Sequence, residues 1–377
     1  MEHEAERAPT RHMSSELPLL FGAGTASLFV LLGDRWLADL SNPFWLMLMF
    51  AWLFLTTLWA ALAAVRHADA LAILLGEPYG TLVLTLSVIC VEVSMISAVM
   101  LHGRNNPTMA RDAMFAVIMI VLNGMVGLAL LAGGWRHREQ HYNLQGANSY
   151  LAVLIPLAVL SLVLPVYTVT TPDPSLSPFQ TVFLIIISLA LYSAFLAIQT
   201  VRHSQYFIDP DDVVEPPGSL PHGAAPPRHP AVRVLLLLAY LIPVVLLAEK
   251  LALPIDYVVE TLGAPQALAG LVVAAVVVTP EATGAIRAAL ANHLQRSVNI
   301  SLGSVLATIG LTVPAVLSIG LISGRKIELG LPPTDVVMLM LTLMVSIVTF
   351  SSARSNVLQG LVHLLLFLAY IMLVFQP

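Results

Sequence analysis

The sequence predicts an all-α integral membrane protein with about eleven transmembrane helices. Hydrophobic residues make up 58% of the 377 residues and charged residues only 10%, whereas roughly a quarter of an average soluble domain is charged. The mean hydropathy is +0.87. The apolar residues also form runs long enough to cross a bilayer, which takes roughly 17–25 residues. That much apolar surface can face lipid, but it cannot be buried in one soluble core.

Eleven apolar runs predict the spanning helices. Their length argues for helices, because transmembrane strands have about ten residues and alternate in polarity. The polar, mixed-charge residues 1–16 lack the features of a cleaved signal, so we expect a cytoplasmic tail followed by a retained leading helix at 17–35. The expected apolar cores of the helices are Leu17–Leu32, Pro43–Val65, Gly80–Leu101, Ala113–Gly133, Tyr150–Thr171, Pro178–Val201, Val232–Glu249, Gln266–Leu290, Val298–Ile322, Asp335–Phe350 and Asn356–Phe375.

One segment, His203–Pro230, interrupts this pattern and is rich in Pro, His and acidic residues. Such a composition cannot bury enough surface to fold alone, so we expect a flexible cytoplasmic linker over 202–231. The linker separates a first five-helix repeat, 43–201, from a second, 232–377. A cation-sensing role remains an alternative to a plain connector. The residues that would serve it are Asp209, Asp211, Asp212, Glu215, His203, His222 and His229.

The distribution of basic residues predicts the topology. An odd number of spans puts the two termini on opposite sides of the membrane. With the N-terminus inside, 11 of the 17 Lys and Arg residues fall on the inner side and six on the outer side. The positive-inside rule therefore favours a cytoplasmic N-terminus and an external or periplasmic C-terminus.

Two carboxylates, Glu92 and Glu281, lie inside apolar runs at corresponding positions of the two repeats. A charged side chain near the bilayer centre costs several kcal/mol, so it usually marks an ion path, a proton relay or a binding site. Aligning the two acids also brings Arg111 onto Arg296 once about four extra residues are allowed in the first loop. Because five is odd, the two repeats have opposite orientations, as in inverted-repeat transporters with sites at the repeat interface. The pattern predicts a protein that handles cations or protons.

A polar stripe accompanies the second carboxylate. Ser304 and Thr308 belong to a series of hydroxyl residues at steps of three and four, and the repeat carries Thr308 onto Asn123. The series consists of Ser297, Ser301, Ser304, Thr308 and Thr312. Neutral oxygens at membrane depth can replace the water shell of a hard cation. The alternative is that these hydroxyls bond back to their own helix or join neighbouring helices.

Pro280 precedes Glu281 and predicts a helix break. A proline inside a helix cannot donate to the carbonyl four residues earlier, here that of Val276. A freed carbonyl beside a carboxylate is a candidate cation ligand. The alternative is a simple packing kink. We expect His363 in the last helix to be packed or solvent-facing rather than a proton relay, because it has no carboxylate at helical spacing.

Composition also excludes several functions. The net charge of −5 comes without a basic stripe, so no nucleic-acid partner is expected. No motif of a hydrolase, nucleotide-binding protein or zinc enzyme occurs, so we expect neither an enzyme nor a bound cofactor. An intramembrane enzyme acting on a lipid or lipid phosphate, and a passive cation channel, remain alternatives. The arginines lie at run ends and in loops, which disfavours the lipid phosphate enzyme.

Four segments resemble the bacterial ChaA-type proton antiporters of the Ca²⁺/cation antiporter superfamily. They are Gly76–Ser97, Pro107–Gly134 (with PTMARDAMFAVIMIVLNGMVG), Ser297–Pro314 (with GSVLATIGLTVP) and the C-terminal SSARSNVLQGLVHLLLF. The resemblance implies a bacterial inner-membrane protein that exchanges a cytoplasmic cation for external protons. Ca²⁺ is the first candidate, and Na⁺ or K⁺ are possible.

By the same resemblance, Glu92 in CVEVS and Glu281 in TPEATG are the acids that hold the metal, although neither follows the Gly-Asn of the wider superfamily. Protons or a cation can neutralise such a pair, but not both fully at once. If only the neutralised site crosses between inward and outward states, that competition alone makes exchange obligatory. Two glutamates match the charge of Ca²⁺, and hydroxyl and backbone oxygens would raise the ligand number towards the roughly six to eight that it prefers.

Overall fold

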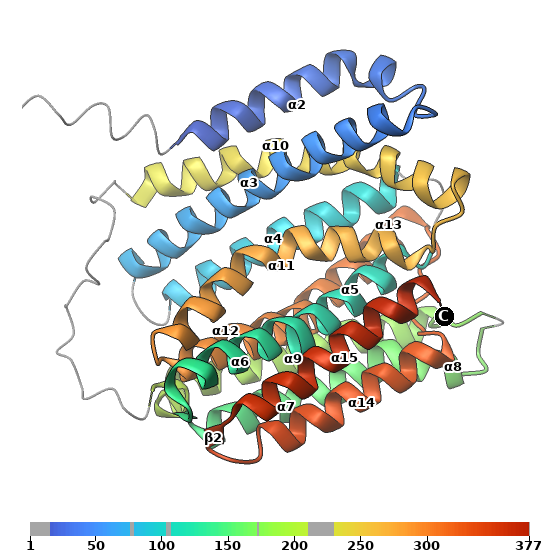
Figure 1. Cartoon of the computed structure of the whole chain (residues 1–377). Helices are drawn as coiled ribbons and strands as arrows, with labels where there is room; N and C mark the ends of the chain where they lie inside the picture. Colours follow the sequence, from blue (N-terminus) through green and yellow to red (C-terminus); the bar gives the residue numbers. More distant parts are fainter. Residues whose placement is uncertain (1–15, 76–78, 103–106, 172, 210–229, 377) are drawn as a thin grey trace, which may run out of the picture. The chain divides into compact units, whose positions relative to one another are not determined.

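The structure, a computed structural model, describes residues 16–75, 79–102, 107–171, 173–209 and 230–376 (Figure 1). The chain forms two compact units. Unit 1 takes its described residues from 1–104 and 225–262, and unit 2 from 105–224 and 263–377. Each unit therefore draws on both halves of the sequence, and each is described by itself below.

Unit 1 consists of four long helices. They are α2 (Leu17–Trp36), α3 (Pro43–Leu75), α4 (Tyr79–His102) and α10 (Pro230–Asp256), which the π-helical segment η6 (Tyr257–Thr261) continues. Helix α10 packs against the other three, and α2 also packs against α3 (Figure 1). The ring of Phe29 meets those of Trp36 and Trp52 edge-on at 5.6 and 5.4 Å. Lys250 on α10 forms an ion pair with Asp34, near the C-terminal end of α2, at 3.0 Å.

Unit 2 holds the remaining helices, several of which contain a π-helical segment. In chain order they are α5 (Met109–Met119), η2 (Ile120–Met125), α6 (Val126–His137), α7 (Leu144–Ala158), η3 (Val159–Val163), α8 (Leu164–Tyr167), α9 (Pro178–Ala197), η4 (Ile198–Arg202), the short 3-10 helix η5 (Ser204–Phe207), α11 (Ala267–Leu290), α12 (Leu294–Ala307), η7 (Thr308–Thr312), α13 (Val313–Ser323), α14 (Pro333–Thr349) and α15 (Val357–Phe375).

The fold class predicted from the sequence is confirmed. Each of the eleven apolar runs coincides with a helix or with a helix continued through a π segment. Within the described residues, nine helices are long and apolar enough to cross a membrane, and α14 and the segment Leu86–Ser97 of α4 are shorter apolar helices. Helix α3 continues ten residues past the predicted Val65, to Leu75. Hydropathy marks where lipid contact ends, whereas backbone hydrogen bonding extends a helix into polar surroundings.

Local signals explain several helix ends. The side chain of Ser177 accepts from the Gln180 backbone while the Gln180 side chain accepts from the Ser177 backbone, which forms a capping box at the start of α9. Asn356 and Gln359 form the same motif at α15. Gly324 ends α13 in the left-handed conformation, at φ +67°, which a residue without Cβ adopts at little cost.

A two-residue antiparallel strand pair joins the ends of two helix pairs in unit 2. β1 (Gln140–His141) follows α6, β2 (Arg354–Ser355) precedes α15, and Gln140 pairs with Ser355. The hydroxyl of Tyr142 donates to the carbonyl oxygens of Thr349, at 3.1 Å, and of Ser352. Burial raises the pKa of Tyr142 to about 12.

Glycines allow the closest helix contacts in unit 2. A Cβ atom at Gly270 of α11 would lie 2.5 Å from the carbonyl carbon of Asp112, at the start of α5. A Cβ atom at Gly360 of α15 would lie 2.6 Å from the backbone nitrogen of Leu131 in α6. The backbones of these helices are therefore in contact, and α11 is held against the helix that carries Asn123.

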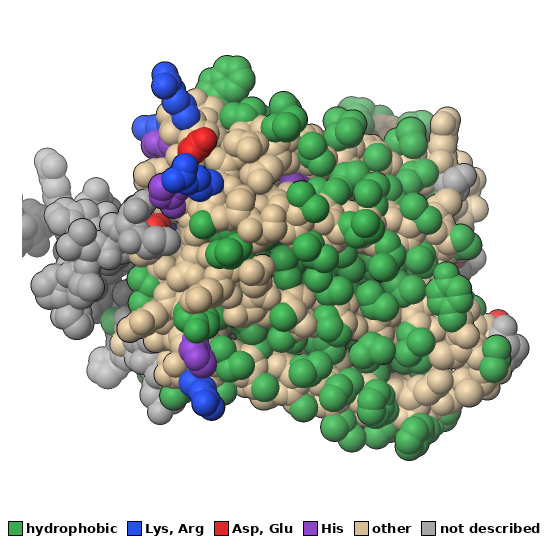
Figure 2. Space-filling view, turned by 90° about the horizontal axis from the view of Figure 1, so that it is seen from below, with side chains coloured by type: hydrophobic (Ala, Val, Ile, Leu, Met, Phe, Trp, Pro, Cys, Tyr) green, Lys and Arg blue, Asp and Glu red, His purple; other side chains and the backbone are tan. Residues whose placement is uncertain are grey.

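The outer surface of unit 2 suits a lipid environment. Figure 2 shows hydrophobic side chains spread across one face, with Lys, Arg and His gathered at one end. Helices α14 and α15 contribute large exposed apolar residues in helical spacing, including Val337, Leu341, Met344 and Val348 on α14, and Leu358, Leu361, Leu365 and Leu368 on α15. Water would disfavour so large an apolar surface, but hydrocarbon does not.

The predicted tail, except Glu16, and linker residues 210–229 lie outside the described residues. The first linker residues are described and pack onto unit 2. The Phe207 ring meets those of Tyr150 and Phe195 at 5.4 and 5.8 Å. The Asp209 carboxylate lies 3.6 Å from Nδ1 of His293. The linker therefore begins as a packed segment at the turn between α11 and α12.

Candidate functional site

The structure brings two of the predicted site residues together in unit 2. Glu281 lies on α11 and Ser304 on the neighbouring α12, and the Ser304 hydroxyl donates a hydrogen bond to Glu281 Oε2. Both side chains are half-buried. A carboxylate and a hydroxyl from adjacent spanning helices thus form one oxygen cluster at membrane depth.

The hydroxyl residues of the stripe on α12 and η7 do not all bond in the same way. Ser301 donates back to the carbonyl of Ser297 at 2.8 Å, so it follows the local hydrogen-bonding interpretation. Ser304 instead reaches across to Glu281. Thr308, one turn further on, is 1% exposed and begins the π-helical segment η7. Ser304, at the middle of the stripe, is therefore the residue that contacts the Glu281 carboxylate.

The predicted helix break at Pro280 is wrong. Helix α11 continues as an α-helix through this proline from Ala267 to Leu290. A proline removes one donor, and dense packing against α5, α6 and α12 keeps the helix continuous. Thr279 and Thr283 also donate to helix carbonyls, at 2.5 and 2.7 Å. The carbonyl of the fully buried Val276 still receives no backbone donor from Pro280.

The second predicted carboxylate, Glu92, lies on α4 in unit 1 and is 1% exposed. Helix α4 packs against α3 and α10. Two residues before Glu92 lies Cys90, whose side chain is exposed. Because a buried carboxylate is costly unless neutralised or bonded, burial at this position requires a proton, a cation or polar partners.

Asn123 lies in the π-helical segment η2 and is fully buried. Its amide nitrogen donates to the hydroxyl of Thr342 on α14 at 2.8 Å, and its amide oxygen lies 3.4 Å from Nδ1 of His363 on α15. The structure thus places Asn123 with two residues that sequence reasoning did not select. A signal existed for Thr342, because Thr342, Ser346 and Thr349 recur at steps of four and three along α14, but the sequence contains none that relates either residue to Asn123.

Two of the π segments, η2 and η7, lie at corresponding positions of the two repeats. The repeat alignment pairs Asn123 with Thr308, and both residues lie in π segments, in η2 and η7. Such segments widen one turn of a helix and are frequent at functional sites. The described residues contain no group of three or more His, Cys, Asp or Glu that could hold a metal ion. A cation in this part of the chain would therefore rely on hydroxyl, amide and backbone oxygens as well as carboxylates.

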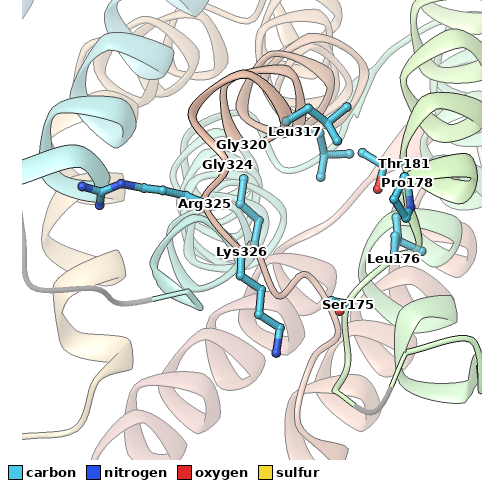
Figure 3. A pocket seen from close by; sticks show the side chains of 11 residues that line it. Ser175, Leu176, Pro178, Thr181, Leu317, Gly320, Gly324, Arg325 and Lys326 are labelled. Carbon is cyan, nitrogen blue, oxygen red and sulfur yellow. The ribbon is translucent and has the colours of Figure 1, made fainter.

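A cavity of about 280 Å³ lies at the end of α13, away from the candidate site along the chain (Figure 3). The side chains of Leu317, Thr181 and Pro178 gather on one side, while Arg325 extends away from them. Lys326 pairs with Asp173 and with Glu328, which raises the pKa of Lys326. The residues lining the cavity are Ser175, Leu176, Pro178, Thr181, Leu317, Gly320, Leu321, Gly324, Arg325, Lys326 and Ile327, so none of the predicted site residues contributes to it.

Comparison with known proteins supports the repeat and the fold. The family described as sodium/calcium exchanger protein matches residues 45–201 and 232–376, one match on either side of the linker. A putative ionic transporter, y4hA, of Sinorhizobium fredii (strain NBRC 101917 / NGR234) is 45% identical over 315 residues, covering 83% of this chain and 85% of the relative. The sodium-potassium/proton antiporter ChaA of Escherichia coli (strain K12) is 40% identical over 324 residues, covering 84% of this chain and 86% of the relative.

Solved structures share the architecture at lower identity. Native YfkE superimposes with a TM-score of 0.71 at 20% identity, covering 96% of this chain and all of that one. The H⁺/Ca²⁺ exchanger CAX gives a TM-score of 0.63 at 13% identity, covering 95% of this chain and 88% of that one. Together with the two-part family match, these similarities confirm the resemblance predicted from the sequence. The chain belongs to the sodium/calcium exchanger family, within the Ca²⁺/cation antiporter superfamily.

Proposed function

We propose that this chain exchanges a cytoplasmic cation for external protons by alternating access, with Glu92 and Glu281 as the carboxylates that take either partner. The observation that carries the proposal is the contact between Glu281 and Ser304 inside two adjacent spanning helices. The relative from Escherichia coli is named a sodium-potassium/proton antiporter, and CAX an H⁺/Ca²⁺ exchanger, which supports proton coupling.

Ser304 fits a carboxylate that alternates between two charge states. A hydroxyl can donate to an ionised carboxylate and accept from a protonated one. An Arg or Lys in the same place would hold Glu281 ionised and oppose a cation. With Ser304 as neighbour, Glu281 can bind a proton in one half of the cycle and a cation in the other without losing a hydrogen bond.

We propose Ca²⁺ as the first cation to test, with Na⁺ and K⁺ as the alternatives. Two glutamates balance a divalent charge, and Ser304, Thr308, Asn123 and the Val276 carbonyl are the proposed neutral oxygen ligands. The ions are transported substrates, and we propose no further cofactor. The proposed location is the bacterial inner membrane, with the N-terminus in the cytoplasm and the C-terminus outside.

Reconstitution tests the proposal. Purified protein is reconstituted into liposomes that contain a pH-sensitive dye and have an acidic lumen. Ca²⁺, Na⁺ or K⁺ is then added outside. We expect a cation-dependent loss of the proton gradient, with uptake of the same cation. Cation uptake without proton movement would contradict antiport and indicate a channel.

A further inference from the structure

Four buried polar side chains connect η2, α14 and α15 inside unit 2. Asn123, Thr342 and His363 are 0% exposed and Thr349 is 4% exposed. Water cannot reach them, so their donors and acceptors must be satisfied within the protein. His363 is the one imidazole in this group, and neither the carboxylates nor the hydroxyl stripe described above explain why it is there.

The hydrogen bonds in this group run in one direction. Met119 Sδ lies 3.6 Å from Asn123 Nδ2 and 3.7 Å from the Thr342 hydroxyl. A thioether sulfur accepts but cannot donate, so the NH₂ end of the Asn123 amide must face Met119 and Thr342. Asn123 Nδ2 accordingly donates to Thr342 Oγ1 at 2.8 Å.

This assignment fixes the imidazole as well. The Asn123 amide oxygen faces His363 Nδ1 at 3.4 Å, and the imidazole also forms a hydrogen bond with the backbone of the neighbouring Leu122. Two acceptors cannot bond, so Nδ1, which faces the Asn123 oxygen, carries the proton. His363 Nε2 is then bare and accepts from the Thr349 hydroxyl at 2.9 Å. Thr349, His363, Asn123 and Thr342 thus form an ordered donor chain that ends at Met119.

We infer that His363 is a positioning residue that holds the Asn123 amide oxygen in a fixed orientation, and so sets the affinity of the transported cation. The inference rests on the proposed function, in which Asn123 supplies a neutral oxygen ligand. A carbonyl oxygen has two lone pairs, so one can accept from His363 while the other binds a cation. Without the imidazole N–H, the amide is held only by the long contact to the Met119 sulfur and by the Thr342 hydroxyl, which can donate as well as accept. The amide can then rotate more readily and present its NH₂ group, which repels a cation.

Two polar substitutions separate positioning from packing. His363→Asn places an amide NH₂ near the position of Nδ1 and keeps the donor to Asn123, whereas His363→Gln extends its amide towards Thr349. We expect His363→Gln to raise the apparent KM for the cation roughly tenfold, the effect of losing one buried hydrogen bond. The maximal rate should change less than about twofold, and His363→Asn should restore most of the affinity.

Ser346→Ala is the matched control. Ser346 lies between Thr342 and Thr349 on α14, is 0% exposed, and has no hydrogen-bond partner for its hydroxyl among the described residues. Its loss removes a buried hydroxyl from the same helix face without breaking the chain, so we expect an unchanged KM.

A double-mutant cycle gives the decisive readout. If His363 acts through Asn123, His363→Gln should add no further loss of affinity to Asn123→Ala. When His363→Gln is combined with Thr308→Val, which lies on a different helix, the fold increases in KM of the two single variants should multiply. An unchanged KM in His363→Gln, or losses that multiply through Asn123→Ala, would overturn the inference. Wild-type protein without cation-dependent proton movement would instead overturn the proposed function, so the two failures are distinguishable.

Discussion

Glu281 is the side chain whose charge we expect to change during each cycle. Its neighbour Ser304 can serve both charge states, whereas glutamine at position 281 can neither ionise nor release a proton. We therefore expect Glu281→Gln to reduce cation-dependent proton movement to the level of empty liposomes, while the protein still enters the membrane.

The matched control for this substitution is Glu139→Gln. Glu139 is 60% exposed at the end of unit 2, where it lies 3.6 Å from an Arg354 nitrogen. A surface pair of this kind contributes little, so near-normal exchange is expected. Near-normal exchange in purified Glu281→Gln would remove Glu281 from the mechanism.

Thr308 tests the hydroxyl stripe at the next turn. Valine keeps the shape of threonine and removes its oxygen, at a site 1% exposed inside η7. We expect Thr308→Val to weaken the apparent cation affinity by about tenfold, as for loss of one polar contact, without abolishing transport. An unchanged affinity, measured by titrating the cation in liposomes, would assign Thr308 to packing alone.

At the scale of helices, α11 approaches the backbone of α5 closely at Gly270. A Cβ atom at Gly270 would lie 2.5 Å from the Asp112 carbonyl carbon, whereas one at Gly284 on the same helix would meet only Ile300 Cδ1, at 3.7 Å. We expect Gly270→Ala to destabilise the protein by about 1–3 kcal/mol, as overpacking does, and Gly284→Ala to be tolerated. Thermal unfolding in detergent compares the two, and equal midpoints would contradict this packing argument.

The sequence predicted the helices well because their length and hydropathy are local properties. It did not predict the π segments around Asn123 and Thr308, because one extra residue in a helical turn leaves hydropathy unchanged. The helix break predicted at Pro280 is absent, because packing against neighbouring helices can keep a proline-containing helix continuous. Both differences arise from packing between helices, which a single-helix pattern does not contain.

The candidate site shows the same difference between local patterns, which a sequence contains, and contacts between distant helices, which it does not. Glu281 and Ser304 lie on helices adjacent in sequence, and a repeat with regular spacing was enough to select both. His363 and Thr342 were not selected, because 240 and 219 residues separate them from Asn123 and no periodic pattern relates them to it. Long-range contacts of this kind depend on the tertiary fold.

At the scale of the whole molecule, the linker divides the chain without belonging to either family match, which end at residue 201 and resume at 232. Asp209 contacts His293, so the dispensable part is expected to begin after it. We expect replacement of Asp211–Pro227 by a Gly-Ser linker of equal length to preserve exchange, because its Pro-rich acidic composition is typical of a connector. Normal membrane levels without exchange would instead make this segment part of the mechanism.

The position of Cys90 has a practical consequence for observing the transport cycle. It is the single cysteine of the chain, it is exposed, and it lies two residues before Glu92 on α4. A thiol-reactive fluorophore or spin label can therefore be attached at one defined place without first removing other cysteines. Its accessibility to reagents added from either side of the membrane would report, in real time, which side the helix carrying Glu92 faces.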